Sequence, residues 1–193
     1  TAKLCREQNI KTIAVTSGYI NPEPAKEFFS LMDAANIDLK GFSETFYSKN
    51  CLAHLEPVLD IIKYVVNETD CFVELTTMLI EGENDGYVEE ECEWILKNLG
   101  DEVPVHFSAF TPRYNFSDRT PTKSETLFNA YNIAKQAGLK YVYTGNILNP
   151  ETSTTYCKNC GKPLLVRDGF RLIESNLENG MCKYCQTVCD GIF

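Results

Sequence analysis

The chain has 193 residues, of which 44% are hydrophobic and 23% are charged, a mixture that excludes general disorder and fibrous repeats. Its 27 acidic and 18 basic side chains give a net charge of −9, which argues against a nucleic-acid partner and against an anionic membrane surface. No apolar run approaches the roughly 18 residues of a membrane helix, and no signal-type stretch opens the chain. The length predicts one main domain with a small appendage.

Patterns typical of strands and helices alternate through the first three quarters of the chain. Strands are expected at Thr12–Ser17, Ile37–Leu39, Cys71–Leu79, Val105–Ala109 and Tyr141–Thr144, from β-branched or buried apolar runs. Helices are expected from Pro24 to Met32, around Leu55–Val65, over Tyr87–Leu99 and from a Ser124 cap to Gly138. Such alternation predicts an α/β fold with a parallel sheet and right-handed crossovers, either an open sheet or a barrel.

The sequence pattern changes after the fifth expected strand, where a short linker precedes a group of cysteines. We therefore expect two domains, residues 1–149 and residues 150–193. The nine cysteines are an odd number without a secretory signal, which favours reduced thiols or metal ligands in the cytoplasm over disulfides. The first residue is Thr1 rather than Met, so we expect a processed chain or a piece of a longer one.

Two C-x2-C motifs lie near the end of the chain, Cys157–Cys160 and Cys182–Cys185, with 21 residues between them. Four thiolates at this spacing are typical of a tetrahedral zinc site. Asp168-Gly169 between them predicts a hairpin turn, so the segment is interpreted as a zinc-ribbon-like module that needs its metal to fold. Two alternatives stay open: free thiols, or an iron–sulfur site that uses Cys182, Cys185 and Cys189.

Short polar groups follow the expected strands, where ligands of α/β proteins bind. Lys40 is the one cation among them and could hold a carboxylate, while Asp38 and Ser17 could hold an amine or ribose hydroxyls. Ordinary surface loops are the alternative. His106 is expected to be a satisfied histidine facing the core or barrel, His54 a surface residue, and Glu89 to Glu91 a solvated helix start.

Six segments in order resemble the radical S-adenosylmethionine (SAM) enzymes of the AmmeMemoRadiSam system, which are relatives of the pyruvate formate-lyase activating enzymes. They are TSGY (16–19), IDLKGF (37–42), FVELTTMLIEGEND (72–85), VPVHFSAFTP (103–112), GLKYVYTGNI (138–147) and the terminal YCKNCGKPL with CKYC. The resemblance spans nearly the whole chain. It implies a partial TIM-type barrel in which SAM is cleaved at a [4Fe-4S] cluster to give a 5′-deoxyadenosyl radical.

The resemblance also implies which residues bind SAM. The strand-two motif maps onto Asp38, Leu39 and Lys40, and the polar turn after strand one maps onto Ser17 and Gly18. The family more often has Asn at the position of Ser17. Relatives often have His where Thr111 stands, near the adenine, so Thr111 is expected to offer a hydrogen bond without an imidazole.

The family's C-x3-C-x2-C cluster motif and its glycine-rich SAM motif are not in these 193 residues. We therefore expect the cluster ligands in an amino-terminal segment before Thr1, an open edge at strand one, and no SAM cleavage by this chain alone. The substrate is not identified by the sequence, and a protein is among the candidates. Two rivals remain: a non-catalytic half-barrel with a zinc ribbon that docks a partner, and a barrel aldolase or synthase with Lys40 as a Schiff base.

Overall fold

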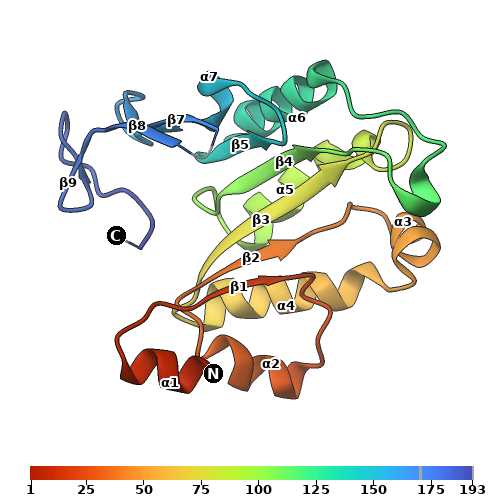
Figure 1. Ribbon diagram of the computed structural model, residues 1–193, viewed down its shortest axis with the longest axis horizontal. Helices are drawn as coiled ribbons and strands as arrows, with labels where there is room; N and C mark the ends of the chain where they lie inside the picture. The colour runs from red at the N-terminus through yellow and green to blue at the C-terminus, as the bar shows by residue number, and fades with distance from the viewer. Residues whose placement is uncertain (170, 193) are drawn as a thin grey trace.

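Five strands form one parallel sheet in the computed structural model, which describes residues 1–169 and 171–192. They are β1 (Ile13–Thr16), β2 (Ala34–Asp38), β3 (Phe72–Leu79), β4 (Val105–Ala109) and β5 (Val142–Gly145). The strands are neighbours in chain order, β1-β2-β3-β4-β5, and every pair is parallel (Figure 1). The predicted parallel α/β sheet is confirmed.

The crossovers between these strands carry the main helices. They are α2 (Pro22–Phe29), α4 (Leu55–Glu68), α5 (Val88–Asn98) and α6 (Ser124–Ala137), and α1 (Ala2–Glu7) precedes β1. Shorter elements are α3 (Glu44–Phe46), a π-helix (Tyr47–Cys51), 3₁₀ turns (Asp85–Tyr87 and Tyr114–Phe116) and α7 (Pro150–Ser153). Because right-handed crossovers join adjacent strands in sequence, α2, α4, α5 and α6 cover one face of the sheet, and Figure 1 shows the opposite face without helices.

The core lies between the sheet and this helical layer. In β3, Val73, Leu75 and Leu79 are buried toward the helices, whereas Glu74 and Thr76 alternate with them on the open face. A side of the sheet without helices and with polar side chains is therefore available for ligands.

Glu91 corrects one sequence expectation. It lies in the first turns of α5 and is only 1% exposed, whereas Glu89 and Glu90 are solvated as expected. Thr77 Oγ1 of β3 donates a hydrogen bond of 2.6 Å to Glu91 Oε1. Burial raises the pKa of Glu91 to about 8, because desolvation penalises the charged carboxylate. The run of three acidic residues at the start of α5 did not indicate that one of them, Glu91, faces the sheet.

Several element boundaries also differ from the sequence expectation. β2 begins at Ala34 rather than Ile37, because Ala34 and Ala35 pair with β1 and β3 despite their low strand propensity. Ser124 is the first residue of α6 and Lys123 occupies the cap position, so the predicted Ser124 cap is wrong. Gly138 ends this helix at φ 117°, as predicted.

β1 is an edge strand, as expected from the resemblance. Among the described residues it pairs with β2 alone. Ile13 and Val15 of this strand are 70% and 77% exposed. Two β-branched side chains at an unpaired edge leave apolar surface that further strands could cover.

The carboxyl-terminal region forms two small antiparallel sheets. One contains β6 (Thr155–Tyr156), β7 (Pro163–Asp168) and β8 (Arg171–Ser175), and the other contains β9 (Leu177–Glu178) and β10 (Met181–Cys182). The predicted hairpin between β7 and β8 is present, but Asp168 pairs with Arg171 and therefore belongs to the strand and not, as expected, to the turn. Phe170, which was assigned to the second hairpin strand, lies outside the described residues.

This region contacts the amino ends of the last two parallel strands. Lys158 Nζ lies 2.5 Å from Glu102 Oε1, just before β4, and 2.7 Å from Asp190 Oδ2. Tyr141 OH, just before β5, donates to Asp190 Oδ2 at 2.9 Å. The terminal cysteines are therefore held at the end of the sheet opposite to the carboxyl ends of the strands (Figure 1).

Candidate functional site

Polar side chains form a hydrogen-bonded row that runs along the open face of β2 and β3 to the carboxyl end of β2. Lys40 Nζ lies 2.6 Å from Asp38 Oδ2, and Asn36 Nδ2 donates to Asp38 Oδ1 at 3.2 Å. Thr76 Oγ1 of the neighbouring strand donates to Asn36 Oδ1 at 2.7 Å. The row fixes a cation and a carboxylate side by side, with Lys40 only partly buried.

Tyr47 and Asn84, which the sequence alone did not identify, form hydrogen bonds with the Lys40 backbone. The backbone N–H of Lys40 donates to Tyr47 OH at 3.0 Å. Asn84 Nδ2 donates to the carbonyls of Lys40 and Met78, and its Oδ1 accepts from the Ile80 N–H at 2.7 Å. Asn84 thus joins the ends of β2 and β3, and a Cβ at Gly41 would come within 3.0 Å of its Cβ. The sequence feature that could have identified Asn84 is its position in the turn-rich segment EGEND (81–85).

A cavity of about 470 Å³ adjoins this row. Ser17 and Lys40 line it on the polar side, and aromatic rings line much of the rest: Tyr19, Phe46, Phe110 and Phe116. A cation beside aromatic walls suits a ligand that combines an anionic group with a flat ring.

The predicted site residues occupy different positions around this cavity. Ser17 and Lys40 line it together, and Asp38 is held against Lys40. Gly18 is buried at φ 67°, where a Cβ would approach Ile37 Cγ2 to 2.9 Å. Leu39 is fully buried in the core, so its side chain faces away from any ligand. Thr111 is exposed and does not line the cavity, whereas its neighbour Phe110 does.

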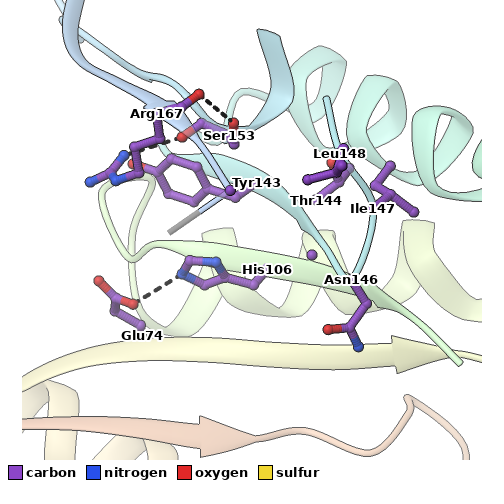
Figure 2. A pocket seen from close by; sticks show the side chains of 11 residues that line it. Glu74, His106, Tyr143, Thr144, Asn146, Ile147, Leu148, Ser153 and Arg167 are labelled. Atoms are coloured by element: carbon purple, nitrogen blue, oxygen red, sulfur yellow. Dashed lines mark hydrogen bonds and ion pairs between the residues drawn. The ribbon is translucent and has the colours of Figure 1, made fainter. Parts of the chain in front are cut away.

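A second cavity, of about 550 Å³, lies on the open face between β3, β4, β5 and β7 (Figure 2). His106 Nε2 lies 3.0 Å from Glu74 Oε2, and the His106 ring stacks on Tyr143 with centroids 4.8 Å apart. The hydrogen bond from His106 lowers the pKa of Glu74, with the Arg167 charge contributing. Burial raises the pKa of Tyr143 to about 12. The expectation of a satisfied, barrel-facing His106 is confirmed.

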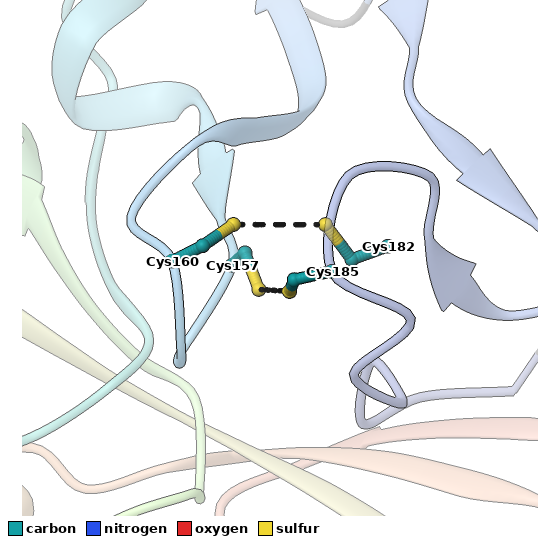
Figure 3. A group of neighbouring side chains, drawn as sticks. All are labelled: Cys157, Cys160, Cys182 and Cys185. Carbon is teal, nitrogen blue, oxygen red and sulfur yellow. Dashed lines mark hydrogen bonds between the residues drawn. The ribbon is translucent and has the colours of Figure 1, made fainter.

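Four terminal thiols converge on one point (Figure 3). The Sγ atoms of Cys157, Cys160, Cys182 and Cys185 all lie within 4.8 Å of one another. The Cys157–Cys185 and Cys160–Cys182 sulfur pairs are 3.5 Å and 3.8 Å apart. Tetrahedral zinc with Zn–S bonds of about 2.3 Å requires sulfurs roughly 3.8 Å apart, so the four predicted ligands fit a single metal ion.

The two cysteine knuckles have the same backbone turn. Gly161 N–H donates to the Cys157 carbonyl, and Gln186 N–H donates to the Cys182 carbonyl. The residue after each knuckle is left-handed, Gly161 at φ 68° and Gln186 at φ 61°. Cys189 is buried beside Cys157 and Cys182 but is not one of the four clustered sulfurs. The geometry therefore favours the four-thiol set over the set of Cys182, Cys185 and Cys189.

The remaining cysteines do not supply a comparable set at the carboxyl ends. Cys71 and Cys92 are buried as expected for small core residues, and Cys5 lies on α1. In the described part of the chain, Cys51 is the one cysteine that lines the first cavity. A [4Fe-4S] cluster with three thiolates therefore does not fit the described residues at that edge.

Residues 1–169 and 171–192 contain no helix that is both long and apolar enough to cross a lipid bilayer.

Comparison with known proteins gives relatives that are longer than this chain. No family model matches the chain. An uncharacterized protein of Methanocaldococcus jannaschii is 40% identical over 189 residues, which are 96% of this chain and 56% of the relative. A GTP 3′,8-cyclase of Limosilactobacillus fermentum is 26% identical over 159 residues, covering 72% and 47% of the two chains. The chain thus spans about half the length of the curated relatives it matches.

A solved structure shows the same fold. The crystal structure of a domain of pyruvate-formate lyase-activating enzyme from Bacteroides vulgatus is similar with a TM-score of 0.62 and 21% identity. The similarity covers 75% of this chain and 87% of that domain. The chain therefore has the α/β fold of this activating-enzyme domain, together with a four-cysteine cluster near its carboxyl terminus.

Proposed function

We propose that this chain is part of a radical SAM enzyme and forms part of the SAM site at the carboxyl ends of its strands. The observation that carries the proposal is the cavity in which Ser17 and Lys40 meet aromatic walls, with Asp38 fixed beside Lys40. The shared fold with an activating-enzyme domain and the distant match to a GTP 3′,8-cyclase support it.

The proposed roles follow from the chemistry of the side chains. The Lys40 ammonium pairs with the SAM carboxylate, and Asp38 and Ser17 accept hydrogen bonds from the SAM amine or ribose hydroxyls. Phe110 and Phe116 offer apolar surface to the adenine. Lys40 Nζ donates to Asp38 Oδ2 at 2.6 Å, so the nitrogen is held by a carboxylate and is not free to attack a carbonyl, which argues against Lys40 as a Schiff-base nucleophile.

A [4Fe-4S] cluster held by the longer protein would supply one electron, and SAM would then be cleaved to methionine and a 5′-deoxyadenosyl radical. Its ligands do not fit the described residues at the carboxyl edge, so we place them in another segment of the longer protein. In the proposed arrangement the 193 residues bind and orient SAM without cleaving it alone. The substrate stays open, with a protein among the candidates, and the reduced thiols favour a cytoplasmic location.

We assign Cys157, Cys160, Cys182 and Cys185 to a structural metal, with zinc as the first choice and iron as the alternative. All four thiols are used within the module, which leaves no open coordination position of the kind that catalytic metals keep. The metal stabilises the module, in this interpretation, and takes no part in SAM cleavage.

The test uses the longer protein that contains the missing segment, reconstituted anaerobically with iron and sulfide. With a strong reductant it should form 5′-deoxyadenosine from SAM. Lys40→Ala should raise the SAM concentration at half-maximal rate at least tenfold, whereas Lys63→Ala, which removes an exposed lysine on α4, should not. An unchanged SAM requirement in Lys40→Ala would reject the proposed site. A reconstituted cluster without any 5′-deoxyadenosine would instead favour the non-catalytic module that docks a partner.

A further inference from the structure

Arg167 of β7 lines the second cavity in a fixed position. Its Nη1 donates to the Ser153 carbonyl at 3.2 Å (Figure 2) and to Thr155 Oγ1 at 2.9 Å. Within the described residues, no carboxylate lies within 4.0 Å of its guanidinium. In a chain with a net charge of −9, an anchored cation without a carboxylate partner, at the wall of a cavity, has its remaining donors available to an anion.

The other walls define what kind of anion fits. The Tyr143 ring and the side chains of Ile147 and Leu148 supply apolar surface. Glu74 lies in the same cavity, paired with His106 at 3.0 Å. Its lowered pKa keeps Glu74 ionised at neutral pH, so a dianion such as phosphate meets more repulsion here than a monoanion. The volume of about 550 Å³ is typical of small-molecule sites.

We propose that this second cavity binds a small organic carboxylate, whose oxygens accept hydrogen bonds from Arg167 and whose apolar body packs on Tyr143, Ile147 and Leu148. The guanidinium is a planar fork that matches a carboxylate. A carboxylate at this position completes the ion pair that Arg167 lacks. The inference is independent of the proposed SAM site, because it concerns a different cavity and different residues.

Benzoate is a suitable probe, and benzamide is its uncharged isostere. We would titrate each into the ¹⁵N-labelled 193-residue chain and follow the backbone amide signals of Gly145 and Asn146, which line the cavity. Benzoate should shift these signals saturably, and benzamide should bind at least tenfold more weakly. Arg167→Gln should weaken benzoate binding at least tenfold. Arg171→Gln, an exposed arginine on the same hairpin, should leave it unchanged.

Arg167→Lys separates folding from binding. This variant keeps the positive charge but loses the planar pair of N–H donors, so its benzoate affinity should fall between those of the wild type and Arg167→Gln. Its amide spectrum should remain that of the folded chain. Inorganic phosphate at the same concentration should not displace benzoate. Equal binding of benzoate and benzamide, equal binding by wild type and Arg167→Gln, or the absence of saturable shifts with benzoate would each overturn the proposal.

Discussion

The two ends of the parallel sheet carry different chemistry. At the carboxyl ends of the strands, Lys40 and Asp38 adjoin an aromatic cavity that contains the single cysteine Cys51. At the amino ends, the contacts of Glu102 and Tyr141 hold a module in which four thiols converge. The number of terminal cysteines suggests iron–sulfur chemistry among them, but the fold places them at the end of the sheet opposite to Lys40 and Asp38.

The two regions also differ in what stabilises them. The main domain has a continuous core between sheet and helices, which includes Ile37, Leu75, Phe107 and Leu127. Among the described residues of the module, the buried cluster consists of Cys157, Leu164, Cys182 and Cys189. Since three of these four are cysteines, we expect the module to need a metal held by its sulfur ligands for stability, whereas the main domain is stabilised by hydrophobic burial.

The largest expected effect is the loss of the metal. Structural zinc contributes on the order of 10 kcal/mol to small domains of this kind, so Cys182→Ser should unfold residues 155–192. The parallel sheet should stay folded, because its core is separate. Metal analysis should give one ion per wild-type chain, and amide spectra should report which region loses dispersion.

Cys189→Ser is the matched control for the metal. It removes a buried thiol of the same module that is not among the four clustered sulfurs, and it should keep the metal. A brown protein in which Cys189 is also protected from alkylation would favour an iron–sulfur site and contradict the structural metal.

The next effect concerns Glu91, whose pKa of about 8 in the folded chain is above its usual value of 4.5. The folded state therefore holds a proton that the unfolded state loses, and stability should fall as pH rises from about 5 to 8, by up to roughly 1.4 kcal/mol per pH unit. Glu91→Gln should remove this slope, and Glu90→Gln, at an exposed position, should keep it. Denaturant unfolding at several pH values measures the difference; identical slopes in wild type and Glu91→Gln would refute it.

Asn84→Ala should destabilise the main domain by about 3 kcal/mol, because it leaves buried backbone groups without partners. The side chain makes three hydrogen bonds at the ends of β2 and β3. Asn98→Ala, which removes one side-chain bond to the Trp94 carbonyl, should cost about 1 kcal/mol or less. The comparison is made by denaturant unfolding, and equal losses would argue against Asn84 as the link between the two strand ends.

The smallest expected effect compares two glycines with positive φ. Gly18→Ala places a Cβ 2.9 Å from Ile37 Cγ2, whereas Gly82→Ala, at φ 75°, meets no atom within 4 Å. Both substitutions strain the backbone, and Gly18→Ala should cost about 1 kcal/mol more because of the added contact. Thermal unfolding of the two variants gives the difference; equal melting temperatures would show that Ile37 moves aside.

The sequence predicted the fold well and the site only partly, for identifiable reasons. Strand and helix order follow from local hydrophobic patterns, and the clustering of the four cysteines follows from their spacing. Glu91 was misplaced because an acidic run does not reveal which of its members faces a sheet. Asn84, Tyr47 and Arg167 act through contacts between segments far apart in the chain, and no local pattern encodes such contacts.

We propose that SAM chemistry belongs to the carboxyl ends of the strands and that the terminal cysteines hold a structural metal. The most direct measurement is 5′-deoxyadenosine formation from SAM by the 193-residue chain alone, reconstituted anaerobically with iron and sulfide and treated with a strong reductant. We expect none above background, because the described residues offer no set of three thiolates beside Lys40. Product that forms from this chain and is abolished by Cys182→Ser would contradict it and place the cluster at the terminal cysteines.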